Sequence, residues 1–311
     1  MSKSNKANGE EEGRNYHIPV LLEEAVELLK IEPGGIYVDC TFGGGGHSRE
    51  ILKRLSKDGK LVAFDQDADA ARNLPEDQRL VYVPENFKHL SRFLRLHQLI
   101  PVDGLIADLG VSSHQFDESE RGFSYRFDAP LDMRMDRRAT KTAATILKEA
   151  SAAGLQQIFS SYGEVQNSRT LANAIVTQRQ SAEIKTTGDL LAILEPLSRG
   201  KGYKYYSQVF QALRIEVNEE LEVLKQLLEQ LPGVVKKGGR VAIITFHSLE
   251  DRMVKQYFRQ GGLNVETDPL YGTKTESPWK EITRKPVEAS GEEKTTNERS
   301  RSARLRVAQL Q

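Results

Sequence analysis

Through the first third of the chain, short apolar runs alternate with segments whose apolar residues have helical spacing. This pattern predicts alternating strands and helices. Four apolar runs predict strands, at Ile36–Cys40, Leu61–Phe64, Leu80–Val83 and Val102–Ala107. Segments with helical spacing lie before and between them, at Val20–Lys30, Ser48–Leu55, Asp67–Leu74 and Phe87–His97. Alternation of this kind predicts a mostly parallel sheet that is covered by helices on both faces.

The alternation stops at Gly122 and resumes after Tyr206. Between these points the sequence predicts helices only, at Ala143–Lys148, Ala152–Phe159, Ser168–Thr177 and Thr187–Glu195. Beyond them it predicts a long helix ended by Pro232-Gly233, a strand, a helix, a loop and a last edge strand, at Val209–Leu231, Arg240–Phe246, His247–Arg259, Pro269–Glu298 and Ala303–Gln309. The predicted fold class is α/β, a doubly wound sheet with an inserted helical domain.

The expected boundaries are a disordered tail over 1–15, a core formed by 16–121 and 207–311, and a helical insertion over 122–206. Cys40 is the one cysteine, so no intrachain disulfide can form, and no Cys/His spacing predicts a metal site. No apolar run reaches the ~20 residues of a membrane span. The polar N-terminal segment lacks the apolar stretch of a secretory signal. We therefore expect a cytoplasmic protein with no membrane partner.

Acidic and basic residues balance at 44 each, which disfavours a free-standing DNA-binding module. Basic residues nevertheless cluster at Arg134–Arg138, Arg199–Lys204 and Arg299–Arg306. Such clusters bind phosphates even on a neutral protein, but solvated loops explain them equally well. The aromatic stretch Gly202–Tyr206 likewise fits either stacking on RNA bases or a plain surface loop.

The strongest chemical signal is the segment Asp39–His47, in which the four glycines Gly43–Gly46 follow the first predicted strand. Without Cβ atoms the backbone can turn tightly and approach a ligand closely. Open α/β sheets bind ligands in the crevice at the carboxyl ends of their strands. A flexible turn without a ligand is the alternative, but a glycine run is entropically costly unless the geometry requires it.

Asp65 ends the second predicted strand, about 20 residues after the glycines, where an acidic side chain accepts hydrogen bonds from a ribose diol. A helix N-cap is the alternative role, for which Asp67 is at least as well placed. The glycine loop lacks the G-x-G-x-x-G of nicotinamide enzymes and the Gly-Lys-Ser/Thr of a P-loop. It also contains no basic residue to meet phosphates. A nucleoside cofactor without phosphates, such as S-adenosylmethionine, fits this loop best.

Asp108 ends the fourth predicted strand, which neighbours the first in a doubly wound sheet, so its side chain should face the same crevice. There it is placed to bind the cofactor or to orient an exocyclic amine of a base, whose lone pair is delocalised into the ring. Capping of the next turn is the alternative. At another strand end, Ser248 and Asp251 predict a capping box, with His247 at the mouth of the crevice. Phe87, after the third strand, fits adenine stacking or core packing.

Seven segments, taken in order, resemble the RsmH (MraW) family. They are Tyr16–Leu22, Val38–Ser48, Asp108–Ser113, Arg121–Ser124, Pro130–Met135, Phe210–Asn218 and Phe246–Asp251. The resemblance runs from His17 to Arg306. It implies a bacterial cytoplasmic enzyme with a Rossmann-like class I methyltransferase core and an inserted helical domain. It further implies that S-adenosylmethionine is used to methylate N4 of a cytidine in the decoding region of small-subunit (16S) ribosomal RNA.

The resemblance also implies site residues. Cofactor contacts fall on Gly45, Gly46, His47, Asp65, Phe87, Asp108 and Gln115. Asp108 is the candidate catalytic residue, and the candidate substrate-binding residues are Arg134, Lys204, His247 and Ser248. Asp108-Leu109-Gly110-Val111 stands where other amino-methyltransferases carry Asp-Pro-Pro-Tyr, so their base-stacking aromatic is not carried over. Small-subunit RNA is the expected partner, no metal is expected, and a homodimer is left open.

Two other functions stay open at this point. One is a small-molecule methyltransferase, which the helical insertion and the basic clusters disfavour. The other is a ribosome-assembly protein that binds RNA and uses the cofactor only structurally. A nicotinamide dehydrogenase is disfavoured because G-x-G-x-x-G is missing.

Overall fold

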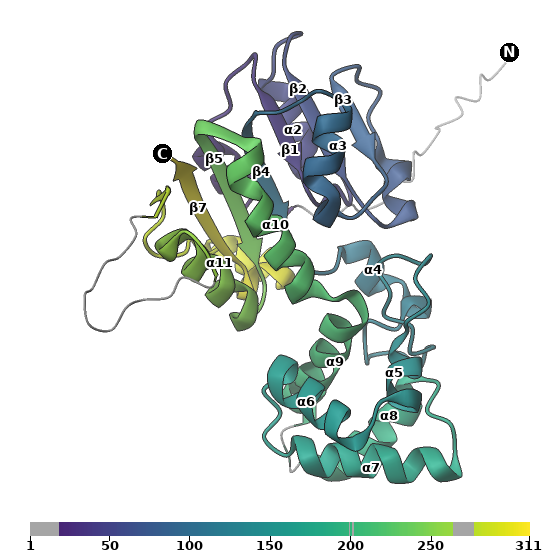
Figure 1. The fold of residues 1–311 in the computed structure, drawn as a ribbon. Coiled ribbons are helices and arrows are strands. Elements are labelled where there is room, and N and C mark those ends of the chain that lie inside the picture. Colours follow the sequence, from purple (N-terminus) through teal and green to yellow (C-terminus); the bar gives the residue numbers. More distant parts are fainter. Residues whose placement is uncertain (1–18, 199, 201, 264–276) are drawn as a thin grey trace, which may run out of the picture.

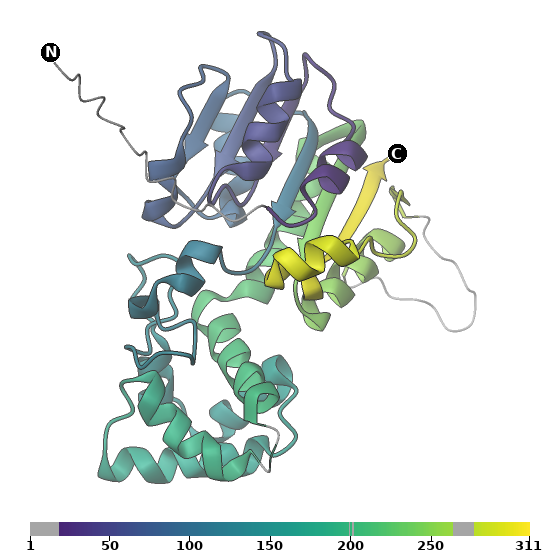
Figure 2. The same cartoon turned by 180° about the vertical axis from the view of Figure 1, so that it is seen from behind.

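The computed structural model describes residues 19–311 except 199, 201 and 264–276. One seven-stranded sheet carries helices on both faces, and a further group of helices lies beside it (Figures 1 and 2). The strands are β1 (Ile36–Asp39), β2 (Lys60–Phe64), β3 (Leu80–Val83), β4 (Val102–Asp108), β5 (Val235–Thr245), β6 (Trp279–Glu281) and β7 (Arg304–Leu310). The predicted disordered tail over 1–15 lies outside the described residues.

Twelve α-helices and five short 3₁₀ segments lie within the described ranges. The α-helices are α1 (Leu22–Leu29), α2 (Gly46–Arg54), α3 (Leu90–Leu96), α4 (Ser113–Asp117), α5 (Ala143–Glu149), α6 (Ala152–Gly163), α7 (Ser168–Ser181), α8 (Thr187–Leu194), α9 (Gly202–Asn218), α10 (Glu220–Val234), α11 (Ser248–Gln260) and α12 (Gly291–Thr296). The 3₁₀ segments are η1 (Ala68–Asn73), η2 (Phe87–His89), η3 (Ser119–Arg121), η4 (Glu195–Leu197) and η5 (Glu298–Ser302). No described helix is long and apolar enough to cross a membrane.

The strand order is β3-β2-β1-β4-β5-β7-β6, in which the first five strands are parallel and β7 is antiparallel to both of its neighbours. This confirms the mostly parallel sheet and the pairing of the first and fourth strands. The prediction of Ala303–Gln309 as an edge strand is wrong, because β7 lies between β5 and β6. The edge is β6, inside the segment predicted as a loop, where three residues are too few to show a period.

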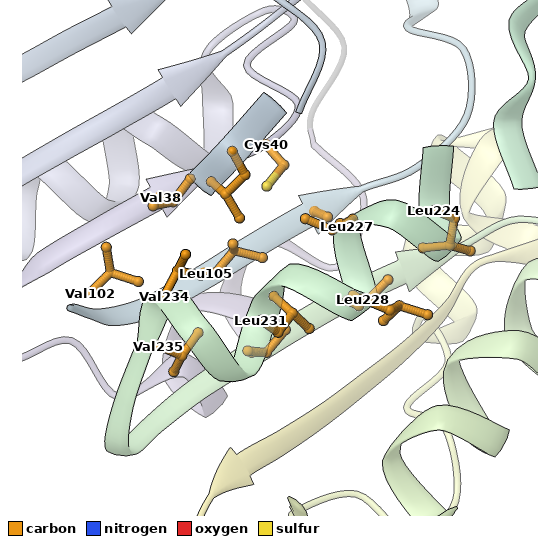
Figure 3. Packing of buried hydrophobic residues seen from close by; sticks show 14 of the residues in the cluster. Val38, Cys40, Val102, Leu105, Leu224, Leu227, Leu228, Leu231, Val234 and Val235 are labelled. Carbon is orange, nitrogen blue, oxygen red and sulfur yellow. The ribbon is translucent and has the colours of Figure 1, made fainter. Parts of the chain in front are cut away.

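Helices cover the two faces of the sheet with separate apolar cores. On one face, leucines of α10 share one apolar core with Val38 of β1 and Leu105 of β4, and Figure 3 labels Leu227, Leu228 and Leu231 in that core. On the other face, α1 and α2 pack on the sheet through Leu29 and Ile51. Strands that are buried on both faces carry continuous apolar runs, which is why their sequence signal was clear.

The predicted long helix Val209–Leu231 is wrong, because two helices occupy this stretch. The chain breaks at Glu219, whose φ of 52° is left-handed and cannot continue a helix. Pro232 does not end the second helix either but lies in the last turn of α10, which runs on to Val234. Apolar spacing continues across the break, so periodicity does not detect it. The break sets Asn218 and Glu220 at the edge of the main cavity.

Helices α5 to α9 share one apolar core that runs in sequence from Val111 to Val217. Figures 1 and 2 show these helices gathered apart from the sheet. Because α9 packs against α6 within this core, we propose that the helical unit extends to Asn218 rather than ending at residue 206. These domain limits are a proposal, which assigns each helix to a domain by the apolar core that it shares.

Candidate active site

A cavity of about 460 Å³ opens where the first four parallel strands end. Its lining comes from the segments after β1, β2, β3 and β4 and from the break between α9 and α10. The strand order changes direction between β1 and β4, and doubly wound sheets bind ligands at such a point. The volume lies within the range of small-molecule and cofactor pockets.

Asp39, the last residue of β1, holds the glycine loop at both of its ends. Its Oδ1 accepts a hydrogen bond from the Thr41 N–H at 3.0 Å, and its Oδ2 accepts one from the Ser48 hydroxyl at 2.6 Å. Between these anchors Gly43 and Gly45 have φ values of 50° and 76°. Both conformations are left-handed and favour glycine.

Two glycines of the loop lie close to other residues of the protein and not only to the cavity. A Cβ on Gly45 would lie 2.8 Å from Cζ of Phe42, and one on Gly46 would lie 1.9 Å from Cγ of Pro19. Gly46 lines the cavity, whereas Gly45 is not among the lining residues. Protein packing therefore accounts for part of the glycine requirement that the sequence attributed to a ligand.

His47 lines the cavity from the first turn of α2, but its ring points toward the N-terminal segment. The ring is buried, with Nε2 at 3.2 Å from the carbonyl oxygen of Val20. A cofactor contact from His47 is therefore best made by its backbone N–H, because first-turn amides have no partner within the helix.

Asp65 lies at the end of β2 beside the glycine loop, and both of its carboxylate oxygens accept backbone hydrogen bonds. Oδ2 accepts from Gly43 N–H at 2.7 Å, and Oδ1 accepts from Asp67 N–H at 2.8 Å. Burial raises the pKa of Asp65 to about 7, against the opposing effect of these two donors. Each oxygen keeps a second lone pair for a ligand hydroxyl. The N-cap role falls to Asp67, which caps η1.

Phe87 and Gln115 also line the cavity, although both have structural partners. Phe87 packs against the core under α3 and α10. The Gln115 amide donates to Asp67 Oδ2 at 2.6 Å, and its oxygen accepts from Ser112 N–H at 3.0 Å. The buried Arg121 also donates to Asp67 Oδ2, at 2.9 Å. Gln115 thus serves a buried network in which Arg121, missed as a site residue, is the cation.

Asp108 ends β4 at the cavity, and its Oδ1 is buried with no hydrogen-bond partner among the described residues. Its backbone N–H donates to Thr41 Oγ1 at 2.7 Å, which fixes β4 against the loop after β1. Burial raises the pKa of Asp108, while the nearby His47 and Arg299 lower it. An unpaired buried acceptor is costly, so this oxygen calls for a ligand donor.

The predicted substrate residues do not gather at the cavity. Arg134 pairs with Asp132 through contacts of 2.7 and 2.6 Å, so its charge is already balanced. Lys204 is exposed on α9, in the helical unit. His247 and Ser248 lie at the start of α11, where Ser248 is exposed. None of the four is among the residues that line the main cavity.

The predicted capping box is wrong in register by one residue. His247 is the N-cap of α11 and pairs with Glu250, rather than Ser248 with Asp251. His247 Nδ1 accepts from the Glu250 N–H, and Glu250 Oε2 accepts from the His247 N–H. Asp251 instead forms a buried pair with Arg306, at 2.6 and 3.1 Å. A ring nitrogen can replace the hydroxyl at a cap, a role that S-x-x-D patterns do not detect.

Sequence reasoning missed two charged groups, Arg299 and Glu220, that line the cavity together with Asp108. Arg299, on η5, lines the cavity with its guanidinium 5.1 Å from the centroid of the Phe246 ring. Glu220 lines it too and is held by Arg214 through two contacts of 2.8 Å. Arg299 belongs to a basic cluster that the sequence left open between a phosphate contact and a solvated loop. Apart from residues of α9, α10 and α11, the other lining residues lie more than one hundred positions before Arg299 in the sequence. No local sequence pattern therefore connects Arg299 to them.

Glu220, His247 and Glu250 bring three ligand-type atoms within 4.8 Å of one another. Each carboxylate already has a cationic or hydrogen-bonded partner, Arg214 for Glu220 and His247 for Glu250, with 3.2 Å between His247 Nε2 and Glu250 Oε1. Arg214 balances the charge of Glu220, and Glu250 accepts backbone hydrogen bonds from Phe246 and His247, so both carboxylates already have partners among the described residues.

The charge of the lining favours a cationic ligand. Seven carboxylates and two arginines line the cavity: Asp65, Asp67, Asp69, Glu85, Asp108, Glu220, Glu250, Arg49 and Arg299. The Arg49 guanidinium donates to the carbonyls of Gly44 and Asn73, at 2.5 and 2.8 Å, so it is committed to the loop. A nucleotide polyphosphate would be repelled here, whereas a sulfonium and an ammonium group would be attracted. The residues therefore fit S-adenosylmethionine.

A second cavity of similar volume adjoins the first between the sheet and the helical unit. The two share lining residues, among them Gln66, Asn86 and Asn218. Lys88, Arg138 and Lys141 also line the second cavity, the last two paired with carboxylates. The site is thus open toward the helical unit along a polar groove.

Comparison with known proteins gives a consistent result. Residues 14–311 match the model of the MraW methylase family. A "Ribosomal RNA small subunit methyltransferase H" of Cytophaga hutchinsonii is 55% identical over 298 residues, 94% of this chain and 99% of that protein. The protein of the same name from Parabacteroides distasonis is 49% identical over 302 residues, 96% and 99% of the two chains.

Among solved structures, a putative rRNA-methylase from Clostridium thermocellum aligns with 95% of this chain and all of its own, at 10% identity and a TM-score of 0.44. The match to the family model spans nearly the whole chain, and the two relatives are about half identical over almost their full length. The chain therefore belongs to the MraW methylase family.

Proposed function

We propose that this protein methylates the exocyclic N4 of a cytidine in the decoding region of small-subunit ribosomal RNA. The family and the relatives make it an S-adenosylmethionine-dependent ribosomal RNA methyltransferase. The atom that is methylated and the region of the RNA are the parts proposed here. The observation that carries the atom is the buried Oδ1 of Asp108, which has no hydrogen-bond partner among the described residues, because an acceptor at the cavity complements the protons of an amine. The region of the RNA is what the resemblance to the family implies.

The cofactor, when bound, supplies a methyl group on a cationic sulfur, which a nucleophilic nitrogen can attack. Asp65 accepts the hydroxyls of its ribose, and the first amides of α2 approach it from the glycine loop. Phe87 lies at the cavity where the adenine ring would pack. The acidic lining stabilises its positive charges.

Asp108 orients the amine. By accepting a hydrogen bond from an N4–H group it raises electron density on the nitrogen and fixes the lone pair for in-line attack on the methyl group. After transfer the extra amine proton leaves to solvent, since the groove beside the cavity connects the site to the surface.

The helical unit is proposed to bind the RNA around the target. Its α9 presents Tyr203, 82% exposed, next to the exposed Lys204, a pairing that suits stacking and phosphate contact. Arg137 is exposed and forms no ion pair with another described residue. Arg134, by contrast, supports the loop that carries Arg137, since its Nη1 donates to the Arg137 carbonyl at 3.1 Å. His247 and Ser248 remain proposed contacts at the start of α11.

The proposal is tested by methyl transfer. Small ribosomal subunits from a strain that lacks this protein are incubated with the purified protein and labelled S-adenosylmethionine, and the RNA nucleosides are separated by mass. We expect labelled N4-methylcytidine. Label on another nucleoside would overturn the proposed atom. Cofactor binding without label in RNA would favour a ribosome-assembly protein, and label only in small molecules would favour a small-molecule methyltransferase.

We also propose a cytoplasmic location, because that is where bacterial ribosomal subunits lie, and fractionation would test it. A homodimer is a further proposal, to be decided by the mass of the protein in solution.

A further inference from the structure

The part of the main cavity beyond Asp108 has its own chemistry. There an acidic and a basic side chain, Asp108 and Arg299, line one space although they come from β4 and η5, far apart in the sequence. Burial raises the pKa of Asp108, and His47 and Arg299 lower it; burial lowers the pKa of Arg299, and Asp108 raises it. The two side chains thus offer one cavity an acceptor and a donor of hydrogen bonds.

Arg299 is held in place by an aromatic ring. Its guanidinium lies 5.1 Å from the centroid of Phe246, a cation–π distance. Gly110 also lies close to that ring, since an added Cβ there would lie 3.4 Å from it. Gly110 also lines the cavity. The Phe246 ring therefore contacts both Gly110 and Arg299, and it holds the guanidinium near the loop that follows Asp108.

Building on the proposed function, we propose that this end of the cavity is the subsite for the target base and that Arg299 is its specificity-determining residue. Asp108 accepts a hydrogen bond from the exocyclic amine, and Arg299 donates a hydrogen bond to O2 of the same pyrimidine ring. The two groups read the amine and the carbonyl of cytosine together.

Recognition of the exocyclic amine alone would not distinguish cytosine from adenine, and the Arg299 donor supplies the difference. Adenine also offers an exocyclic amine next to a ring nitrogen, but the position that corresponds to O2 of cytosine is a C–H. The N–H group that donates to O2 would face this C–H instead and lose that one hydrogen bond, and a buried donor that faces no acceptor is penalised. Arg299 thus selects a cytosine over an adenine at the site of transfer.

The test pairs a change in the protein with a change in the base. Small subunits are reconstituted with ribosomal RNA that carries cytidine or 2-thiocytidine at the methylated position, since sulfur is a weaker acceptor than oxygen. We compare kcat/KM for the wild type and for Arg299→Met. We expect the wild type to lose about tenfold on 2-thiocytidine. Arg299→Met should lose at least tenfold on cytidine and should not distinguish the two bases.

The controls separate recognition from folding. Arg301→Met removes an exposed arginine from the same 3₁₀ turn and should keep the wild-type discrimination. S-adenosylmethionine affinity within threefold of the wild type shows that Arg299→Met is folded. If it is not, Arg299→Lys, which keeps the charge but offers fewer donors, takes its place and should discriminate less than the wild type.

The two proposals fail in different ways. An equal penalty for 2-thiocytidine in the wild type and the Arg299 variant would overturn the base subsite, even while cytidine is methylated. A wild type that labels no cytidine at all would instead overturn the proposed function.

Discussion

The Oδ2 atom of Asp65 accepts a hydrogen bond from the backbone N–H of Gly43 at 2.7 Å, which ties the end of β2 to the glycine loop after β1. The carboxylate is therefore oriented before any ligand arrives. Its burial is tolerated because two backbone donors satisfy it, and a ligand hydroxyl can be added without rearrangement.

The first prediction concerns cofactor affinity. Asp65→Ala removes the acceptor for the ribose hydroxyls, and we expect the dissociation constant for S-adenosylmethionine to rise about 100-fold, the loss of two charge-assisted hydrogen bonds. Calorimetry measures it. Asp58→Ala, at an exposed turn before β2, is the matched control and should bind as the wild type does. Unchanged affinity in a folded Asp65→Ala protein would refute the ribose role.

The pH dependence of the same affinity follows from the raised pKa of Asp65, about 7 in the structure without ligand. Ribose hydroxyls donate to the ionised carboxylate, so binding lowers this pKa and releases protons. Affinity should be highest above pH 7 and weaken by up to about tenfold per unit as pH falls below it. Calorimetry in buffers with different ionisation enthalpies detects the protons. Proton uptake on binding would contradict the assignment, and Asp65→Asn should abolish the release.

Backbone strain allows a separate test of the connection to the helical unit. Gly122 has a φ of 70°, and a Cβ there would lie 2.1 Å from the carbonyl oxygen of Pro130. Gly122→Ala should lower the free energy of unfolding by roughly 3 kcal/mol, through left-handed strain and overpacking together. Urea unfolding measures it. Gly233→Ala in α10, where nothing lies within 4 Å, should be neutral or slightly stabilising. Equal effects of the two changes would disprove this account.

The alternation of strands and helices was predictable because each buried parallel strand is a short apolar run. Val38 and Leu105, for example, lie in runs that pack on both sides. The glycine loop and Asp65 were also accessible, since their spacing along the chain reflects one β-α-β unit. The family, the fold class and the use of S-adenosylmethionine were predicted and are confirmed.

What escaped prediction depends on contacts between distant segments. Arg299 reaches the cavity only because β7 inserts between β5 and β6, which brings η5 to the sheet. The break at Glu219 was hidden because apolar spacing continues through it. His247 replaces Ser248 as a cap through its ring nitrogen, a choice that local pattern rules do not contain.

Arg137 and Arg134 lie in one loop, but only the substitution of Arg137 should weaken RNA binding. Arg137→Glu removes an exposed cation and adds a negative charge, so RNA affinity should fall about fivefold to tenfold and the salt dependence should become shallower. Arg134→Ala should act chiefly on stability, because its guanidinium holds Asp132 and the Ala139 carbonyl. Filter binding over a salt series and thermal unfolding provide the two readouts. If Arg137→Glu binds RNA as tightly as the wild type, this loop is a solvated face.

The corrected start of α11 leads to the last prediction. Asp251 and Arg306 form a buried pair, and Asp251→Ala leaves the guanidinium without its carboxylate inside the protein. We expect a loss of about 3–5 kcal/mol in the free energy of unfolding, the usual result when one partner of a buried pair is removed. Ser248→Ala, at the neighbouring exposed position, should change it by less than about 0.5 kcal/mol because Ser248 is not the cap. Denaturant unfolding of both variants measures these changes. A fall in the free energy of unfolding of Ser248→Ala as large as removal of an N-cap causes would show that Ser248 is the cap after all.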